Sequence, residues 1–325
     1  MQQHVLSCDW GTSSFRLRLI DTSTRSCLAK VESDRGNASL FNEWKAQKVD
    51  RVPFYLQYVK QAIGELKVNS GLPVNNLPVL ISGMASSSVG MKELPYADLP
   101  FSLDGSSAYA EWVDGAPVLE NKILLISGAH QRDDVMRGEE TQLVGLASLL
   151  DLNAGDNTLF ILPGTHSKHI AISGNSISRF NTFMTGELFD IIARHSILSH
   201  AVHDAKQDEI SEEERKSFYD GVKRSLGAEL TGTLFSVRIN QLKKYLSPEQ
   251  NYFYLSGLLI GSEVKYLTNQ KLILCSSSRL QRLYEWALDC VDLLNQTHVV
   301  SSEMLDNAAT VGQLKIYAGM VNLNK

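Results

Sequence analysis

The chain has 325 residues, enough for two domains that each bury a core, and its formal net charge of −5 argues against a nucleic-acid-binding surface. No apolar run approaches the ~20 residues needed to span a bilayer, and the N-terminus lacks a signal-like basic and apolar segment. The 4 cysteines are widely spread, without C-x-x-C spacing. We therefore expect a cytoplasmic protein with reduced, buried thiols.

The first motif lies at residues 8–19, which read C-D-W-G-T-S-S-F-R-L-R-L. Phe, Leu and Leu at 15, 17 and 19 alternate with arginines, a pattern typical of a strand with one buried face. Asp9, Gly11 and Thr12 form a small polar turn before it. The N–H groups and hydroxyls of such a turn can hold an anion, and Asp9 can hold a cation beside it. Alternatively, Asp9 is an Asx-turn acid that caps its own loop.

A similar motif occurs at residues 159–172, L-F-I-L-P-G-T-H-S-K-H-I-A-I. Gly11-Thr12-Ser13-Ser14 aligns with Gly164-Thr165-His166-Ser167, and apolar strands flank both turns. Two copies of a strand–turn–strand unit indicate a duplicated domain with two anion-binding turns. Because the match is short, chance is the alternative.

Between the two motifs, alternating strands and helices indicate an α/β domain with a mixed sheet. We expect a strand at 27–31, a polar irregular stretch at 35–51, a helix at 53–68, buried strands at 78–82 and 123–127, and a helix at 139–150. The small-residue loop at 83–90 follows a buried strand, where a ligand can approach the backbone closely.

The second half continues in the same style. Ser211 with Glu214, and Ser247 with Gln250, have the spacing of helix-capping boxes. We expect helices at 186–198, 255–267, 279–294 and 306–321, and strands at 272–275 and 298–301. No low-complexity linker separates the halves, so we expect them to pack through short connections and share a cleft.

The order of these landmarks resembles that of the actin, sugar kinase and Hsp70 superfamily. Four strings together are similar to the 2-dehydro-3-deoxygalactonokinase family over nearly the whole chain: V-M-R-G-E-E-T-Q-L-V-G (135–145), P-G-T-H-S-K (163–168), F-M-T-G-E-L (183–188) and L-S-G-L-L-I-G-S-E-V (255–264). The loop G-M-A-S-S-S-V-G and the following Pro95-Tyr96 also resemble that family.

The resemblance implies two actin-like (ribonuclease H-like) domains, with mixed sheets flanked by helices and an interdomain cleft. We expect one domain at 1–138 with 304–325, and the other at 139–303. The family phosphorylates the 6-hydroxyl of 2-dehydro-3-deoxy-D-galactonate with ATP and Mg²⁺. The alternatives are a kinase for another sugar acid, such as 2-dehydro-3-deoxygluconate, or a non-catalytic nucleotide-binding regulator. The expected partner is the small sugar acid, with no nucleic acid or membrane, and the chain could form a homodimer.

The resemblance also assigns residues to ATP. The two turns would hold its phosphates through Gly11, Thr12, Ser13, Gly164, Thr165 and Ser167. Lys168 would steady a phosphate as a point charge, or is a solvated strand residue. Asp9 would hold Mg²⁺, mainly through water. Ser276 and Ser277 would lie at the adenosine, where the superfamily usually has Gly-Gly, so nucleotide choice is open.

At the acceptor end, Glu139 or Glu140 would take the proton of the sugar hydroxyl, with Asp9 also catalytic. Acids are common in a first helical turn because they suit the helix dipole, and the choice between the two, or a role for Asp133 or Asp134, stays open. Arg137 would pair with the substrate carboxylate, or else form an interdomain salt bridge. The hydroxyls of the loop would grip the sugar, unless the loop is a plain flexible connection; these are Ser86, Ser87 and Ser88.

Overall fold

The structure is a computed structural model that describes residues 2–150, 152, 157–204, 209–268 and 270–323. The chain divides into two compact units. Unit 1 contains residues 1–155, 173–179 and 303–325, and unit 2 contains residues 156–172 and 180–302. Residues 1 and 324–325 of the expected first domain, and 151, 153–156, 205–208 and 269 of the second, lie outside the described residues.

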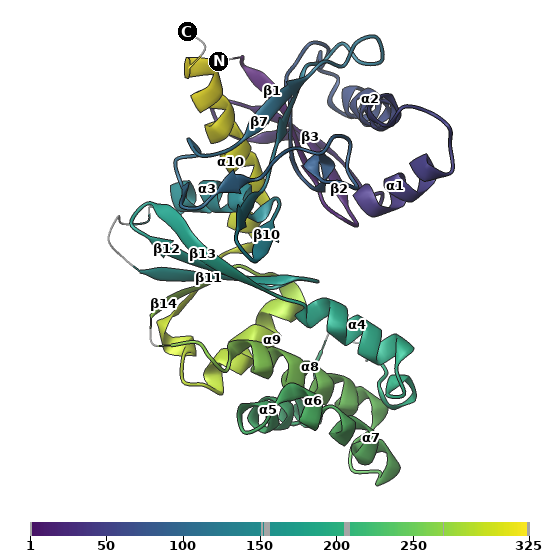
Figure 1. The fold of residues 1–325 in the computed structure, drawn as a ribbon, viewed down its shortest axis with the longest axis vertical. Helices are drawn as coiled ribbons and strands as arrows, with labels where there is room; N and C mark the ends of the chain where they lie inside the picture. The colour runs from purple at the N-terminus through teal and green to yellow at the C-terminus, as the bar shows by residue number, and fades with distance from the viewer. Residues whose placement is uncertain (1, 151, 153–156, 205–208, 269, 324–325) are drawn as a thin grey trace. The chain divides into compact units, whose positions relative to one another are not determined.

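Unit 1 is built on a mixed sheet of six strands (Figure 1). Its order is β3 (Cys27–Ser33), β2 (Phe15–Asp21), β1 (His4–Trp10), β4 (Val79–Gly83), β8 (Ile123–Ile126) and β7 (Ala110–Val113). Strands β1, β2 and β3 pair antiparallel, whereas β4 is parallel to both β1 and β8. A smaller sheet has the order β10 (Asp134–Met136), β9 (Ala129–Gln131) and β5 (Ala97–Asp98).

Helices cover both faces of the large sheet. Successive side chains of a strand point to opposite faces, and in β1 buried apolar side chains lie on both faces. Leu6 belongs to the apolar cluster shared with helix α2 (Arg51–Ser70), whereas Val5 packs with Leu314 and Ile316 of helix α10 (Ser302–Leu323). Unit 1 also contains α1 (Asn37–Lys45), the 3₁₀ turn η1 (Met84–Ser86) and α3 (Glu139–Leu149).

A buried polar network fixes α10 to the sheet. The side chain of Gln313 donates to Cys8 O and Ser82 Oγ, both at 2.8 Å. Ser7 Oγ donates to Gln313 Oε1 at 2.7 Å and lies 2.9 Å from Thr310 Oγ1. Since buried polar groups are costly unless paired, these bonds define the position of the helix along the strands.

Unit 2 repeats the strand order of unit 1, as the sequence repeat predicts. Its sheet has the order β15 (Thr297–Val299), β14 (Lys271–Leu274), β11 (Thr158–Leu162), β12 (Ser167–Ser173) and β13 (Ser176–Phe183), followed by β6 (Phe101–Ser102). The β13 residues that pair with β6, Ser176 and Ile177, belong to unit 1. Strand β11 is antiparallel to β12 and parallel to β14, as β1 is to β2 and β4.

Helices form the rest of unit 2. They are α4 (Thr185–His195), α5 (Glu212–Leu226), α6 (Leu230–Thr233), α7 (Phe235–Leu242), α8 (Pro248–Val264) and α9 (Ser278–Asp289), with 3₁₀ turns η2 (Ser199–Ala201) and η3 (Leu294–Gln296). Both predicted capping boxes are confirmed, at the starts of α5 and α8. Helix α8 is almost entirely buried.

Two expectations differ from the structure. The stretch at 35–51 contains helix α1 and the start of α2 rather than irregular chain. The expected domain boundary after residue 138 differs from the observed division, since α3 belongs to unit 1. Helices α3 and α10 touch through Gly145 and Gly312, where an added Cβ would overlap the carbonyl oxygens of Ala308 and Thr141.

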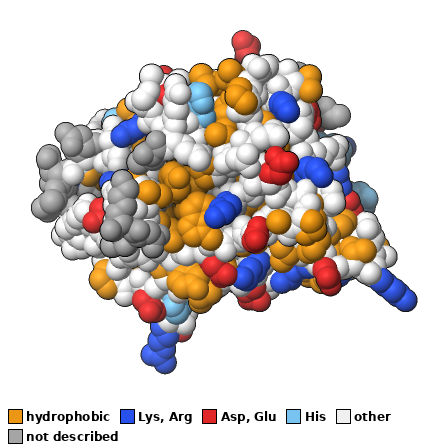
Figure 2. All heavy atoms as spheres, turned by 90° about the horizontal axis from the view of Figure 1, so that it is seen from above, with side chains coloured by type: hydrophobic (Ala, Val, Ile, Leu, Met, Phe, Trp, Pro, Cys, Tyr) orange, Lys and Arg blue, Asp and Glu red, His pale blue; other side chains and the backbone are white. Residues whose placement is uncertain are grey.

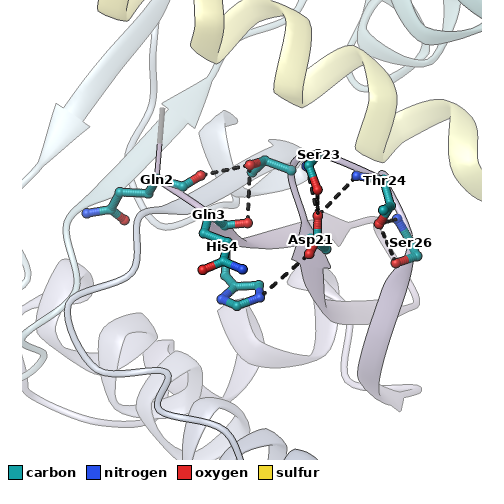
Figure 3. Close-up of polar contacts among 8 residues, drawn as sticks. Gln2, Gln3, His4, Asp21, Ser23, Thr24 and Ser26 are labelled. Atoms are coloured by element: carbon teal, nitrogen blue, oxygen red, sulfur yellow. Dashed lines mark hydrogen bonds and ion pairs between the residues drawn. The ribbon is translucent and has the colours of Figure 1, made fainter.

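The turn between β2 and β3 is held by Asp21, at the opposite end of the strands from the first motif (Figure 3). Asp21 Oδ1 accepts hydrogen bonds from Ser23 Oγ (2.6 Å), Ser23 N (2.8 Å) and Thr24 N (3.0 Å). These bonds favour the carboxylate and lower the pKa of Asp21 to about 2. The Thr22 hydroxyl donates to Gln2 O at 2.8 Å and so ties the first described residue to the sheet.

Other sequence expectations concern the surface and the thiols. No described helix is both long and apolar enough to cross a bilayer. The cysteines are free, but Cys27 is exposed, so the expectation of buried thiols is wrong there. On the face drawn in Figure 2, Lys and Arg side chains of the described residues lie among Asp and Glu rather than in one basic area.

The contact between α3 and α10 yields a test. We expect Gly145→Ala to lower the free energy of unfolding by roughly 1–3 kcal/mol, because its Cβ would push the two helices apart. Urea unfolding at neutral pH measures the change. The control is Gly64→Ala in α2, where an added Cβ meets nothing within 4 Å and a gain of up to about 1 kcal/mol is expected. Equal effects at both positions would contradict the packing argument.

Candidate active site

In the first turn the start of a helix occupies two carbonyls, and two amides are left unbonded within the described residues. Gly11 N donates to Ser14 O at 2.9 Å, which closes the turn, while Asn37 N and Ala38 N donate to Gly11 O and Thr12 O at 3.0 Å. An added Cβ at Gly36, just before α1, would overlap Thr12 O. Within the described residues, the exposed Thr12 and Ser13 have N–H groups without a protein acceptor. Such groups can bind an anion.

The second turn has the same construction in unit 2. Glu187 N of α4 donates to Thr165 O at 3.0 Å, and an added Cβ at Gly186 would lie 2.5 Å from Gly164 O. Thr165 and His166 are exposed, and their N–H groups also have no acceptor among the described residues. Gly186 thus packs closely against the second turn, as Gly36 does against the first, which extends the similarity beyond the predicted motif.

Ser167 and Lys168 differ from the predicted picture of exposed phosphate ligands. Ser167 is fully buried, and its Oγ accepts from Gly164 N at 3.3 Å and lies 2.9 Å from the Tyr284 hydroxyl. Its hydroxyl is therefore turned inward. Lys168 is only 5% exposed, so the alternative of a solvated strand residue is wrong.

Asp9 lies at the end of β1 beside the first turn. Its side chain is 24% exposed, and its Oδ2 lies 3.3 Å from Arg16 Nη1. Partial burial raises the pKa of Asp9, while the positive charges of Arg16 and Arg18 oppose this. One carboxylate beside outward amides fits a Mg²⁺ ion that is shared with phosphate oxygens and water.

Two glycines bring the start of α3 to the same end of the sheet. An added Cβ at Gly83 would lie 2.7 Å from Trp10 O, and one at Gly138 would lie 3.3 Å from Gly83 Cα. Both glycines have positive φ, 94° and 109°, which side-chain-bearing residues rarely adopt. This close approach places Glu139 and Glu140 next to the end of β1, within unit 1.

The two glutamates differ in access. Glu139 is half-buried, and its Oε2 accepts from Arg137 N at 3.0 Å. Glu140 is fully buried; its Oε2 and Oε1 lie 2.8 and 3.1 Å from Gly138 N, and Thr141 donates to Oε1 at 2.9 Å. Burial, and then the negative charge of Glu139, raise the pKa of Glu140 to about 7.

Arg137 is buried among neutral groups of unit 1. Its Nη1 donates to Ser86 Oγ at 2.7 Å and to Ser127 Oγ at 3.2 Å, and its guanidinium carbon lies 4.0 Å above the ring of Tyr96. Within the described residues it makes no ion pair, and its Nε has no hydrogen-bond partner. The predicted alternative of a salt bridge therefore finds no support, and the buried positive charge suits an incoming anion.

The serine loop is ordered rather than a plain flexible connection. Ser86 ends η1 and Ser87 follows it; both are buried, and their hydroxyls donate to Gly83 O (3.3 Å) and Met84 O (2.7 Å). Only Ser88 of the three is exposed. The prediction that all three hydroxyls face a sugar is corrected, because residues in a tight turn bond back to carbonyls of the preceding turn.

The predicted adenosine residues lie where β14 passes into α9. Ser276 is 7% exposed, whereas Ser277 is exposed at the N-cap of α9 and makes no side-chain capping bond. Their role toward a nucleotide stays a prediction. Asp133 and Asp134, the other carboxylates considered, lie at β10, where Asp134 Oδ1 accepts from Val135 N at 2.8 Å.

Sequence reasoning missed several residues that build the site. Gly36 falls in the stretch predicted to be irregular, and Ser127 ends a predicted strand. Tyr96 belongs to a string that resembles the family, but the sequence predicts no function for it. Glu263 is the last but one residue of another such string, and the one acid in that mostly apolar string is an available signal.

The repeated strand order, with a turn of unbonded amides after the first strand of each unit, is typical of the actin-like fold of sugar kinases. A family model described as 2-keto-3-deoxy-galactonokinase matches residues 9–312, so the chain belongs to that family of kinases. Membership of this kinase family implies that ATP is the phosphate donor.

Individual relatives agree. A protein of Rhizobium meliloti (strain 1021) described as a 2-dehydro-3-deoxygalactonokinase is 38% identical over 267 residues, covering 80% of this chain and 79% of the relative. The 2-dehydro-3-deoxygalactonokinase of Escherichia coli (strain K12) is 28% identical over 301 residues, covering 90% and 91%. A solved structure from Sinorhizobium meliloti, also described as such a kinase, superposes with a TM-score of 0.78 at 34% identity, covering 98% and 96%.

The raised pKa of Glu140 makes stability depend on pH. The folded-state pKa of about 7 exceeds the ordinary 4.5, so the unfolded state releases this proton first, and stability falls as pH rises between these values. Wild type loses this stability as pH rises, whereas Glu140→Gln has no proton to lose. We therefore expect the free energy of unfolding of Glu140→Gln, relative to that of wild type, to increase by about 3 kcal/mol from pH 4.5 to pH 8. Urea unfolding across this range measures the difference.

Glu139→Gln is the matched control, since it removes a charge that raises the pKa of Glu140. The pH-dependent loss of stability should then occur at lower pH. A constant difference between Glu140→Gln and wild type at all pH values would contradict the raised pKa.

Proposed function

We propose that this protein transfers the γ-phosphoryl group of ATP to the 6-hydroxyl of 2-dehydro-3-deoxy-D-galactonate in the cytoplasm, with Mg²⁺, as part of galactonate catabolism. The observation that carries the choice of a sugar acid is Arg137. A guanidinium that is buried among hydroxyls, a carbonyl and an aromatic ring is costly unless an anion joins it. The carboxylate of a sugar acid would supply that anion through paired hydrogen bonds.

In this proposal the two turns bind the phosphates. The outward N–H groups of Thr12 and Ser13 in unit 1, and of Thr165 and His166 in unit 2, would donate to phosphate oxygens without competing protein acceptors. Asp9 would hold Mg²⁺, which neutralises phosphate charge when bound. Phosphoryl transfer depends chiefly on such positioning and charge neutralisation.

Glu139 would accept the proton of the attacking hydroxyl. It is the accessible carboxylate of the pair, whereas Glu140 is fully buried with its oxygens already bonded to Gly138 and Thr141. A general base has to reach the proton it removes, so access decides between them. Glu140 would instead fix the start of α3, on which Glu139 is carried.

The first test is ADP release by the purified protein with Mg-ATP and a panel of sugars. We expect turnover with 2-dehydro-3-deoxy-D-galactonate and little with its gluconate epimer or with glucose. We expect Arg137→Gln to raise the KM for the sugar acid roughly 10- to 100-fold, because hydrogen bonds between charged groups are lost. The KM for ATP is the internal control and should not change.

The other outcomes are informative. Turnover with the gluconate epimer would support the assignment as a kinase but change the assigned substrate. Turnover with glucose, unaffected by Arg137→Gln, would contradict the carboxylate role. ATP binding without turnover on any sugar would favour a regulator that retains the fold.

The base assignment has its own test. We expect Glu139→Gln to lower kcat by about 10²–10⁴, the usual contribution of a positioned general base. Glu140→Gln should lower kcat by less than about tenfold, since its one amide oxygen, placed at Oε1, can still accept from Gly138 N and from Thr141. Steady-state rates at saturating substrates measure both. A larger loss in Glu140→Gln would reverse the assignment.

A further inference from the structure

Glu263 is a carboxylate buried inside unit 2, and the proposed chemistry does not use it. It lies near the end of α8, among Leu259, Ile260 and Val264, and its side chain is 1% exposed. A charged group at such a position requires several hydrogen bonds to offset its lost hydration.

Three different elements supply those bonds. His169 Nε2 of β12 lies 2.9 Å from Glu263 Oε1. The hydroxyl of Thr185, the first residue of α4, and that of Tyr284 of α9, at 2.8 Å, both donate to Glu263 Oε2. One carboxylate thus connects β12, which follows the second turn, to the start of α4 and to the middle of α9.

The bonds continue from Tyr284 to the second turn. Since the Tyr284 hydroxyl donates its proton to Glu263, it accepts from Ser167 Oγ at 2.9 Å. Ser167 Oγ in turn accepts from Gly164 N at 3.3 Å. The chain of donors Gly164, Ser167 and Tyr284 therefore ends at Glu263, with one proton for each bond.

The opposite side of the turn is bound to the same carboxylate through α4. Thr185 precedes Gly186, which packs against Gly164 O, and Glu187 N donates to Thr165 O at 3.0 Å. Both the inner side of the turn and the helix that occupies its carbonyls are thereby fixed by Glu263.

We propose that Glu263 is a positioning residue for the phosphate donor: through Tyr284–Ser167 and through Thr185 it holds residues 164–167 so that the amides of Thr165 and His166 face outward. This inference rests on the proposed binding of ATP phosphates by that turn. A fixed set of donors binds an anion more tightly than a mobile one, since ordering is not paid on binding.

The test uses Tyr284→Phe in the full-length protein, which cuts the bond from Glu263 to the turn and leaves Glu263 its bonds to His169 and Thr185. We expect the dissociation constant and the KM for ATP to rise about fivefold, the effect of one positioning hydrogen bond. The KM for the sugar acid should remain within about twofold, because Arg137 and its neighbours lie in unit 1.

Tyr219→Phe is the matched control. It also removes one hydroxyl bonded to α9, that of Tyr219 to Asp289 Oδ2 at 3.2 Å, without contact to the turn. It should leave ATP binding unchanged. If both variants lower the unfolding temperature alike and neither weakens ATP binding, the network is only structural and the proposal is overturned.

Glu263→Gln is the second variant. The amide N–H groups of Gln would face the donors that now bond to Glu263, so at least one of these hydrogen bonds would be lost. We expect the affinity of this variant for ATP to fall at least as far as that of Tyr284→Phe. Calorimetric ATP binding needs no turnover, so it separates the two proposals. A wild type that binds ATP without phosphorylating a sugar acid would overturn the proposed function alone, and one that binds no ATP would overturn both.

Discussion

The close approach of a helix glycine to a tight turn is the constraint on which the rest of this structure depends. Gly36 and Gly186 bring the starts of α1 and α4 against the two turns, so that helix N–H groups occupy the turn carbonyls. The amides of the exposed turn residues have no acceptor among the described residues, so they are available to bind an anion. The paired strands on either side of each turn fix its two ends, and the contact with Gly36 or Gly186 fixes its orientation.

The two copies of this arrangement have diverged in what holds them. In unit 1 the side chain of Asn37 donates to Trp10 O and Gly11 O, and the strand before the turn carries Asp9 at its end. In unit 2 Leu162 occupies the position of Asp9, and the carboxylate lies deep inside as Glu263. Unit 1 thus has a partly exposed acid that a cation can reach, whereas unit 2 has a buried acid that is hydrogen-bonded to three elements.

The elements that were predictable are those with local signals. The alternating strands, the capping boxes at Ser211 and Ser247, and the turn repeat follow from residue spacing, and the structure has them. Helix α1 is not predicted because it has only 9 residues and no capping side-chain bond, and its first N–H groups are bonded to the distant turn. The inward hydroxyls of Ser86 and Ser167 could not be predicted, because each also bonds a partner distant in sequence, Arg137 for Ser86 and Tyr284 for Ser167.

Helix α10 follows the whole of unit 2 in the chain, yet it covers one face of the sheet of unit 1. During synthesis, Val5, Leu80 and Leu124 on that face lack this cover until α10 has left the ribosome. At ordinary translation rates this interval is on the order of ten seconds. The nascent chain therefore carries an uncovered apolar sheet face until residues 302–323 have been synthesised.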